Sequence, residues 1–437
     1  MNLTIYRGTH EIGGNCVEVA TSTTRIIIDL GMPLSDPRDK NKKFNSFAIR
    51  NKTVSQLLSD GVLPKVKGLY RADTSEEPVS AVLISHPHQD HYGLCRFIRE
   101  DVPILVGKDA FKMLTVSDVF LNDLFGSFDH TSSLKDKQES IGDIRVTPYL
   151  VDHSAYGAMS FLIEADGKKI FYTGDFRAHG RKKELFERFL RNPPKKNRVL
   201  IMEGTMLSRP DERVQTEDDL ELEIANKAYS HRGLKLFACS GQNVDRIVTF
   251  YRAAKRTGSL FILDLYAANV LYELGRKTLP LPTNSFKDVK VLFTKHFMKK
   301  LSIRKKKDWY TRWRPYEISP EELHRLGGKA FVIYRERSIP ELEIAGIPAG
   351  SVLFYAQWRD YMKETSFDET RKFMKKHKIS LIEAHTSGHA PVKDLKRLAR
   401  VLNPGFIIPI HTKERDKFSR YFGKKVYLLN DGENFQV

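Results

Sequence analysis

Short apolar runs that end in a histidine or an acidic residue recur along the 437-residue chain. Strands are predicted for these runs: 25–31, 82–84, 169–176, 198–205 and 406–410. The polar groups at or just beyond their ends are Asp29, His86, Asp175, Glu203 and His411. Layered α/β folds build active sites from polar groups at one edge of a sheet. The pattern therefore predicts an α/β fold whose chemistry lies at the strand ends.

The stretch 83–91, Leu-Ile-Ser-His-Pro-His-Gln-Asp-His, concentrates four polar groups at a predicted strand-to-helix turn. His86 and His88 alternate like strand residues and project together, whereas Asp90 and His91 lie one turn further on and can face a second point. Imidazoles and carboxylates are preferred ligands of zinc and similar metals. Two nearby ligand pairs indicate two ions, the arrangement that hydrolyses phosphate esters. A histidine-rich surface turn is the alternative, but three histidines in six positions of a chain with only 14 argue against it.

The domain organisation follows from the length and from a change of pattern near residue 207. A chain of 437 residues is too long for one ordinary core. After residue 207, predicted strands and amphipathic helices alternate, which is typical of a parallel sheet. The earlier pattern returns in the last segment, with predicted strands at 379–384 and 406–410. We expect a first part at 1–206, an inserted α/β domain at 207–370 and a return to the first domain at 371–437.

The charge favours a polyanionic partner, because 72 Lys and Arg against 54 Asp and Glu give a formal charge of +18. A basic but inert surface is the alternative. The most basic part of the predicted insert, 287–316, contains three lysines that we expect to bind substrate: Lys305, Lys306 and Lys307. Trp309, Tyr310 and Trp313 follow, and together these residues could combine phosphate contacts with base stacking. The alternative places the aromatic residues in the core of the insert and the lysines on its solvated face.

The cysteine pattern and the hydropathy limit the cellular compartments that the sequence allows. Cys16, Cys95 and Cys239 lie far apart without a Cys-x-x-Cys pair, so neither a disulfide framework nor a thiolate metal site is expected. The N-terminus has no signal-peptide pattern, and no apolar run approaches the ~20 residues that a membrane span needs. We expect a cytoplasmic protein that does not insert into membranes.

The order of these motifs resembles the metallo-β-lactamase superfamily: His-x-His-x-Asp-His at 86–91, then His153, Gly174-Asp175 and His411. Within it, the insert and the motif His-Thr-Ser-Gly-His-Ala at 385–390 resemble the β-CASP nucleases. The pieces most similar to ribonuclease J and its short prokaryotic relatives are Glu11-Ile12-Gly13, Gly174-Asp175-Phe176, Glu203-Gly204-Thr205 and Pro409-Ile410-His411. The resemblance implies a metallo-β-lactamase αββα sandwich with an inserted β-CASP α/β domain.

The resemblance also implies two Zn²⁺ ions, with Mn²⁺ as an alternative. One ion would be held by His86, His88 and His153, and the other by Asp90, His91 and His411, with Asp175 bridging. Glu203 matches the acidic motif of the group, and His389 matches its catalytic histidine. Pro87 stands where relatives commonly carry a small residue, and it removes no ligand. The chain ends soon after His411, so the C-terminal domain of full ribonuclease J is expected to be missing.

The expected chemistry is hydrolysis by a hydroxide that two metal ions make available near neutral pH. Asp90 would orient it, Asp175 would bridge the ions, and His389 would donate a proton to the leaving group or stabilise the oxyanion. His385 and Ser387 either hold a neighbouring phosphate or make ordinary hydrogen bonds at a strand end.

Two acidic residues are expected to support the ligands rather than to bind metal: Asp29 and Glu203. A carboxylate at the end of an apolar strand is costly unless it is hydrogen-bonded, so we expect Asp29 to orient a metal-binding histidine. The alternative is an aspartate that opens the turn before Gly31.

The favoured function is a metal-dependent ribonuclease that cleaves single-stranded RNA internally or from its 5′ end. The preference for RNA rests on the resemblance alone. The alternatives are a single-strand DNA nuclease of the repair type, a small-molecule metallo-hydrolase and a nucleic-acid-binding protein with a degenerate site. The basic insert argues against a small substrate, and the complete set of seven expected ligands argues against a degenerate site. Both a monomer and a homodimer remain open.

Overall fold

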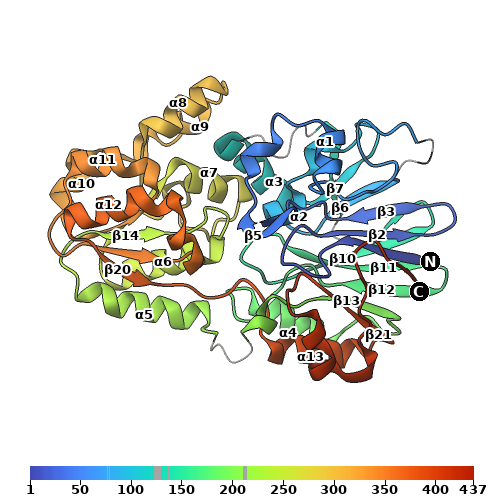
Figure 1. The fold of residues 1–437 in the computed structure, drawn as a ribbon. Coiled ribbons are helices and arrows are strands. Elements are labelled where there is room, and N and C mark those ends of the chain that lie inside the picture. The colour runs from blue at the N-terminus through green and yellow to red at the C-terminus, as the bar shows by residue number, and fades with distance from the viewer. Residues whose placement is uncertain (76, 78, 123–128, 136, 210–213) are drawn as a thin grey trace.

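Two β-sheets pack face to face in the computed structural model, which describes residues 1–75, 77, 79–122, 129–135, 137–209 and 214–437 (Figure 1). The first sheet has the order β22 (Asn434–Gln436), β1 (Asn2–Arg7), β2 (Cys16–Ala20), β3 (Arg25–Ile28), β6 (Ala81–Ile84), β7 (Ile104–Gly107) and β8 (Thr131–Leu134). The second has the order β21 (Phe406–Ile410), β13 (Val199–Glu203), β12 (Lys168–Tyr172), β11 (Met159–Ala165), β10 (Ile144–Leu150) and β9 (Glu139–Ile141). Each sheet combines antiparallel and parallel pairs.

The two sheets share one core, which alternate side chains of their strands fill. Ile26 and Ile28 of β3 face this core, whereas Ile27 between them faces the opposite side of the sheet. On the second sheet, Phe161 and Ile163 of β11 point into the same core. Because side chains alternate along a strand, each sheet also presents a second apolar face that requires a cover.

Helices cover both outer faces, which gives an αββα sandwich. Beside the first sheet lie α1 (Val54–Ser59), α2 (Gln89–Tyr92) and α3 (Lys108–Ser117), and beside the second lie α4 (Lys183–Arg191), α13 (Val392–Leu402) and α14 (Phe418–Phe422). Leu395, Leu398 and Leu402 of α13 follow the helical period and pack on the second sheet. A two-stranded sheet of β4 (Ser35–Asp36) and β5 (Asp39–Lys43) lies in the long segment before α1.

A third, wholly parallel sheet forms the other half of the molecule, on the left in Figure 1. Its order is β17 (Glu317–Ile318), β16 (Val289–Leu292), β15 (Leu260–Asp264), β18 (Ala330–Ile333), β14 (Lys235–Ala238), β19 (Val352–Tyr355) and β20 (Ser380–Glu383). One face packs on α5 (Glu217–Tyr229), α6 (Val244–Arg256) and α7 (Leu265–Leu274), and the other on α10 (Pro320–Leu326), α11 (Ile339–Ala345) and α12 (Asp368–His377). Parallel strands covered on both faces explain the continuous apolar runs. The remaining helices are α8 (Lys295–Ile303) and α9 (Asp308–Thr311).

The third sheet extends past residue 370, where we expected the inserted domain to end. Residues 380–383 form β20, which pairs in parallel with β19 after the crossover helix α12. The strand predicted at 379–384 therefore belongs to this sheet and not to the sandwich. Apart from this end point, the division into 1–206, 207–370 and 371–437 stays a prediction.

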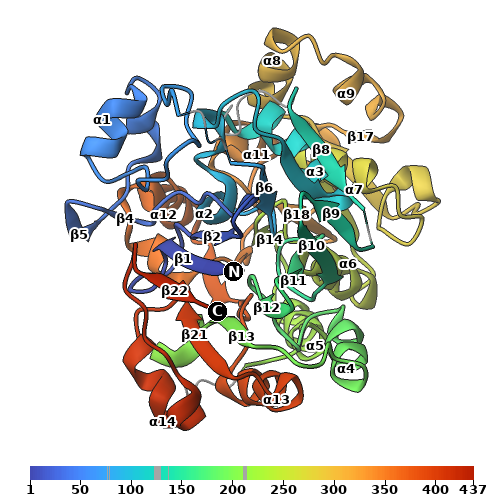
Figure 2. The same cartoon turned by 90° about the vertical axis from the view of Figure 1, so that its right-hand side faces the viewer.

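The two ends of the chain lie side by side in the first sheet, because β22 pairs with β1 (Figure 2). Within the described ranges, no helix has both the length and the apolar character that crossing a membrane requires.

Candidate metal centre

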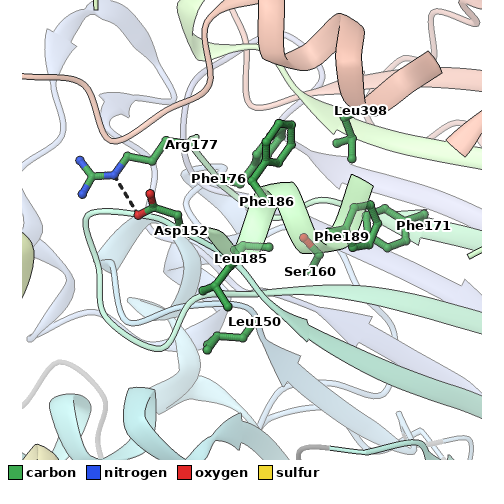
Figure 3. A pocket seen from close by; sticks show the side chains of 11 residues that line it. Leu150, Asp152, Ser160, Phe171, Phe176, Arg177, Leu185, Phe186, Phe189 and Leu398 are labelled. Atoms are coloured by element: carbon green, nitrogen blue, oxygen red, sulfur yellow. Dashed lines mark hydrogen bonds and ion pairs between the residues drawn. The ribbon is translucent and has the colours of Figure 1, made fainter. Parts of the chain in front are cut away.

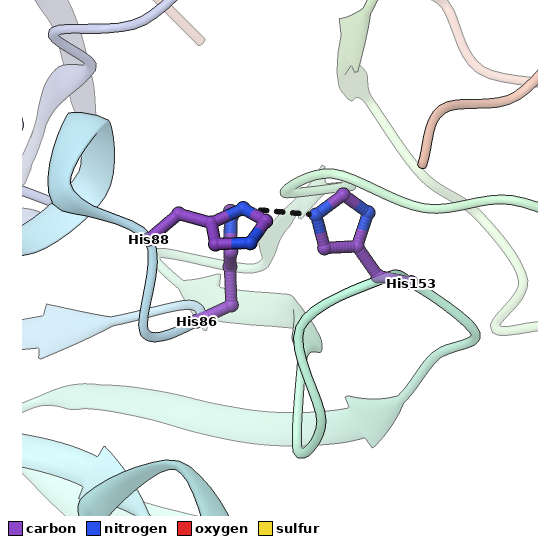
Figure 4. Close-up of side chains that lie close together, drawn as sticks. All are labelled: His86, His88 and His153. Carbon is purple, nitrogen blue, oxygen red and sulfur yellow. Dashed lines mark hydrogen bonds between the residues drawn. The ribbon is translucent and has the colours of Figure 1, made fainter. Parts of the chain in front are cut away.

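Three histidines from two loops meet at the ends of β6 and β10 (Figure 4). His86 and His88 follow β6, and His153 lies between β10 and β11. Nδ1 of His88 lies 3.3 Å from Nε2 of His153, and the three ring centroids lie 4.8 to 5.0 Å apart. Two nitrogens bound tetrahedrally to one zinc, at bonds of about 2.0–2.1 Å, are themselves about 3.4 Å apart. The three imidazoles therefore fit one metal ion.

A second group lies beside the first and contains Asp90, His91 and His411. Nε2 of His411 is 3.3 Å from Oδ2 of Asp90. Asp175 stands between the two groups, because its Oδ2 is 3.2 Å from His91 Nε2, 3.6 Å from His411 Nε2 and 3.6 Å from His86 Nε2. All seven residues expected to bind metal thus lie together, with Asp175 in the position that a bridging carboxylate requires.

Hydrogen bonds to Nδ1 orient four of these histidines. The pairs are His86 with Ser85 Oγ (3.0 Å), His91 with Asp29 Oδ2 (2.8 Å), His153 with the Gly388 carbonyl (2.6 Å) and His411 with Thr205 Oγ1 (2.9 Å). These partners act as acceptors, so each Nδ1 carries the proton and each Nε2 keeps its lone pair. Nδ1 donation to an acceptor is the usual way in which proteins fix a metal-binding imidazole.

Asp29 makes the contacts that its position at the end of an apolar strand demands. Its carboxylate accepts hydrogen bonds from the backbone and hydroxyl of Ser85 (2.7 and 2.8 Å), the Tyr172 hydroxyl (2.7 Å) and His91 Nδ1 (2.8 Å). A fully buried carboxylate with four donors is well compensated. The contact with His91 agrees with the expected orienting role.

Sequence reasoning missed three of the residues that support the ligands: Ser85, Tyr172 and Thr205. Thr205 was signalled by its place in the Glu203-Gly204-Thr205 piece, and Ser85 by its position directly before His86. Nothing in the sequence marks Tyr172, because its contact with Asp29 joins residues 143 positions apart.

Buried atoms without hydrogen-bond partners mark the place where a cation fits. In the part of the chain that the structure describes, these include Nε2 of His86, Nε2 of His91 and Oδ1 of Asp175. The His91 nitrogen does lie 3.2 Å from the other oxygen of Asp175, at poor hydrogen-bond geometry. Lone pairs and a carboxylate that converge without donors suit a divalent metal ion.

The electrostatics differ between the two ligand groups. Burial lowers the pKa of His88 to about 4, and it lowers the pKa values of His86 and His153 well below the ordinary value. Burial opposes ionisation of Asp175, but the neighbouring His411 and His91 hold its pKa well below the usual range. Burial opposes protonation of His91, but Asp175 and Asp29 outweigh it and raise the pKa of His91 well above the ordinary value, so metal binding by His91 would release a proton.

His389 lies at the rim of this cluster and pairs with Glu203. Its Nδ1 is 3.2 Å from Oε2 of Glu203 and 3.8 Å from Oδ2 of Asp175. The other oxygen of Glu203 accepts from the backbone of Phe176 and Ala390, both at 3.3 Å. Burial lowers the pKa of His389, but Glu203 and Asp175 outweigh it and raise that pKa to about 9. A histidine that is protonated at neutral pH can donate a proton.

The remaining expected substrate residues do not join the cluster. The Ser387 hydroxyl accepts a hydrogen bond from the His389 backbone (3.1 Å), which is the local contact left open as an alternative. Nδ1 of His385 lies 3.4 Å from the Ala356 carbonyl, and its ring meets Trp358 edge-on. Phosphate binding by these two residues stays a prediction.

Lys305, Lys306 and Lys307 are exposed between α8 and α9, which project at the top of the third-sheet half in Figure 1. The side chains of Trp309 and Trp313 are 8% and 0% exposed within the core of that half. Of the two roles that the sequence left open for these tryptophans, base stacking and a place in the core, the structure shows the place in the core.

Two fully buried arginines hold the loop that carries His389. Arg177 contacts Asp152 (3.2 Å, Figure 3), Asp245 (2.6 Å), Glu217 (3.3 Å) and the Ser387 carbonyl (3.2 Å). Arg246 contacts Glu217 (3.1 Å) and three carbonyls, those of Ala356, Ala384 and Thr386. Because α5 and α6 supply Glu217, Asp245 and Arg246, this network joins the third-sheet half to the metal centre. We call it the arginine junction.

Comparisons with known proteins agree with these features. Residues 11–209 match the sequence profile of the Metallo-beta-lactamase superfamily. The chain is 20% identical to ribonuclease J of Helicobacter pylori (strain B128), over 100% of this chain and 60% of that protein. It is 21% identical to ribonuclease J 2 of Streptococcus pyogenes serotype M3, over 98% of this chain and 74% of the relative. The predicted resemblance is confirmed.

A solved structure shares the fold of nearly the whole chain. The molecule matches the crystal structure of a protein of unknown function from Enterococcus faecalis V583 with a TM-score of 0.79 and 20% identity, over 99% of both chains. The predicted fold class, a metallo-β-lactamase αββα sandwich with an inserted α/β domain, is therefore confirmed. The chain spans about 60% of the length of the Helicobacter relative.

Proposed function

We propose that the protein is a metal-dependent ribonuclease that hydrolyses phosphodiester bonds of single-stranded RNA, within the strand or from its 5′ end. The observation that carries the proposal is the position of Asp175, whose Oδ2 lies 3.2 to 3.6 Å from histidines of both ligand groups. Two ions a few ångströms apart are typical of phosphodiester hydrolysis. The choice of RNA follows the names of the ribonuclease J relatives.

Each of the two ligand groups holds one metal ion in this proposal. His86, His88 and His153 hold one Zn²⁺, and Asp90, His91 and His411 hold the other, with Mn²⁺ as an alternative metal. Bound ions of this kind supply an activated water and screen the charge that develops on the phosphate. Asp90 is less buried than the histidines behind it, and it orients the attacking water.

His389 serves as the proton donor. Its Nδ1 faces Glu203, so Nε2 remains to protonate the leaving oxygen or to stabilise the charge on it. Glu203 keeps the imidazole protonated and fixes its orientation. His389 lies beyond the seven ligands, so its removal should leave metal binding intact.

The test uses RNA and DNA of matched sequence, each labelled at the 5′ end or internally. Cleavage should stop when a chelator is added and return with zinc or manganese, and the labels separate internal from 5′ cleavage. Metal analysis of the folded protein should give two ions per chain; well under one ion would contradict the proposal. Equal or faster cleavage of single-stranded DNA would replace RNA by DNA as the substrate.

A further inference from the structure

A basic cavity lies on the outer face of the second sheet, between α13 and α14. Its volume is about 400 Å³, and Lys396, Arg400, Lys425, Tyr421 and Phe422 line it. Both helices lie beside β21 at the lower edge of the molecule in Figure 2. None of these residues takes part in the metal centre or the arginine junction.

Positive charge is concentrated around this cavity. Residues 393–425 contain ten Lys and Arg against three Asp and Glu, so this short segment supplies +7 of the formal +18. Arg397 and Lys417 are paired with nearby carboxylates. Lys396, Arg400 and Lys425 are exposed, and within the described part of the chain no carboxylate lies within ion-pair distance of them. Lys425 donates a hydrogen bond to the amide oxygen of Asn403, which is neutral, at 2.7 Å.

Aromatic rings stand among these cations. Tyr421 and Phe422 are half-buried and line the cavity, with their ring centroids 6.5 Å apart. The Lys396 ammonium lies 5.1 Å from the Tyr421 ring. Cations for phosphates next to aromatic faces for bases are the combination that binds single-stranded nucleic acid without sequence preference. An acidic polypeptide would use the cations but would leave the rings without a role.

The cavity and the metal centre are connected by one edge strand. Ile407 lines the cavity, and His411 of the metal centre follows four residues later along β21. At about 3.3 Å per residue the two points are about 13 Å apart. Ile407 faces the outer core and Ile410 the inner one, so the cavity lies behind the sheet that carries the ligand. β21 is the outermost strand of its sheet, and Val426 and Tyr427 pair with its edge at Ile407, next to the cavity.

We propose that this cavity is a second binding site for single-stranded nucleic acid, which anchors part of a strand outside the metal centre. The identification of that strand as RNA rests on the proposed function. The site itself rests on the cavity, its unpaired cations and its two rings.

The test is photocrosslinking of an oligouridine that contains 4-thiouridine, followed by mass spectrometry of the crosslinked peptides. Crosslinks at Tyr421 or Phe422 are expected. The triple variant Lys396→Ala, Arg400→Ala, Lys425→Ala should lose these crosslinks. Its slope of log affinity against log salt should flatten by about 2, since each phosphate contact of a single strand contributes about −0.7.

A matched control removes three exposed lysines from the third-sheet half: Lys255→Ala, Lys287→Ala and Lys329→Ala. Equal flattening in the control, crosslinks confined to other segments, or displacement of the oligouridine from the cavity by polyglutamate but not by single-stranded DNA would each overturn the proposal. Crosslinking does not require cleavage. A preparation that never cleaves RNA but crosslinks at Tyr421 would refute the proposed ribonuclease and leave this site standing.

Discussion

Two basic regions of this protein have opposite surroundings. In the arginine junction, Arg177 and Arg246 are 0% exposed, and both contact Glu217 and backbone carbonyls. In the α13–α14 cavity, Lys396 and Arg400 are exposed and have no carboxylate nearby among the described residues. The basic residues of the chain thus include cations that hold the fold together and cations that remain available to a polyanion.

The difference predicts how each region responds to mutation. A buried ion pair that loses one partner leaves an uncompensated charge, which costs about 3–5 kcal/mol. An exposed cation contributes at most about 1 kcal/mol to stability, and its effect depends on salt. Substitutions in the junction should therefore change folding and turnover, whereas substitutions on the surface should change only binding.

The largest effect is expected for Arg246→Met, which removes one of the two arginines that contact Glu217 and the donor to three carbonyls. Unfolding free energy should fall by about 3–5 kcal/mol, measured from urea transitions of both proteins. Arg252→Met on the same helix is the control. Arg252 is exposed, and its contact with Glu221 is long, at 3.7 Å. A fall of similar size in the control would show that the junction has no special role.

His389→Ala should lower kcat by about 10²–10⁴-fold, the range typical of a lost general acid. Metal content should stay the same, because His389 lies outside the seven expected ligands. His385→Ala is the matched change in the same loop, and it should raise KM or do nothing while kcat is retained. Loss of a metal ion from His389→Ala would mean that this histidine is a ligand.

Arg177→Lys keeps the buried charge but removes the planar group that reaches Asp152, Asp245 and the Ser387 carbonyl together. The free energy of unfolding should drop by about 1.5–3 kcal/mol, the value of hydrogen bonds to charged groups. Turnover should fall while KM and metal content hold, because the loop that carries His389 moves. Arg181→Lys is the control. Arg181 pairs with Asp218 and Glu221 and not with the loop that carries His389, so this variant should leave kcat unchanged.

The meeting of the seven expected ligands could be predicted from the sequence, because strands that end side by side bring their following residues together. Their assignment to two metal ions came from the resemblance and stays a prediction. The role of Asp29 was equally visible, since a lone carboxylate in an apolar strand requires donors. The arginine junction could not be seen in this way. Arginine is mostly exposed, and the burial of Arg177 depends on residues as distant as Asp152, Glu217 and Asp245 meeting at one point.

The sequence contains a signal that favours the core role of the tryptophans. Trp309 and Trp313 are four residues apart, the spacing that places two side chains on one face of a helix, and an apolar face usually turns inward. The strand at 379–384 was located correctly but assigned to the wrong sheet. Only the pairing of β20 with β19, which the sequence does not encode locally, decides between the two.

The smallest effect on folding is expected for the triple variant Lys305→Ala, Lys306→Ala, Lys307→Ala. The three lysines are exposed, so the free energy of unfolding should change by less than about 0.5 kcal/mol, whereas Arg246→Met should lower it by several kcal/mol.

If Lys305, Lys306 and Lys307 contact phosphates, the salt slope of RNA binding should flatten by about 2 in this variant, as single strands give about −0.7 per contact. No crosslink to Trp309 or Trp313 should form, because both rings are buried. The lysine control at Lys255, Lys287 and Lys329 removes equal charge. An unchanged slope in the α8–α9 variant would show that the substrate path avoids this turn, and it would leave the metal centre and the α13–α14 cavity as the sites that bind the strand.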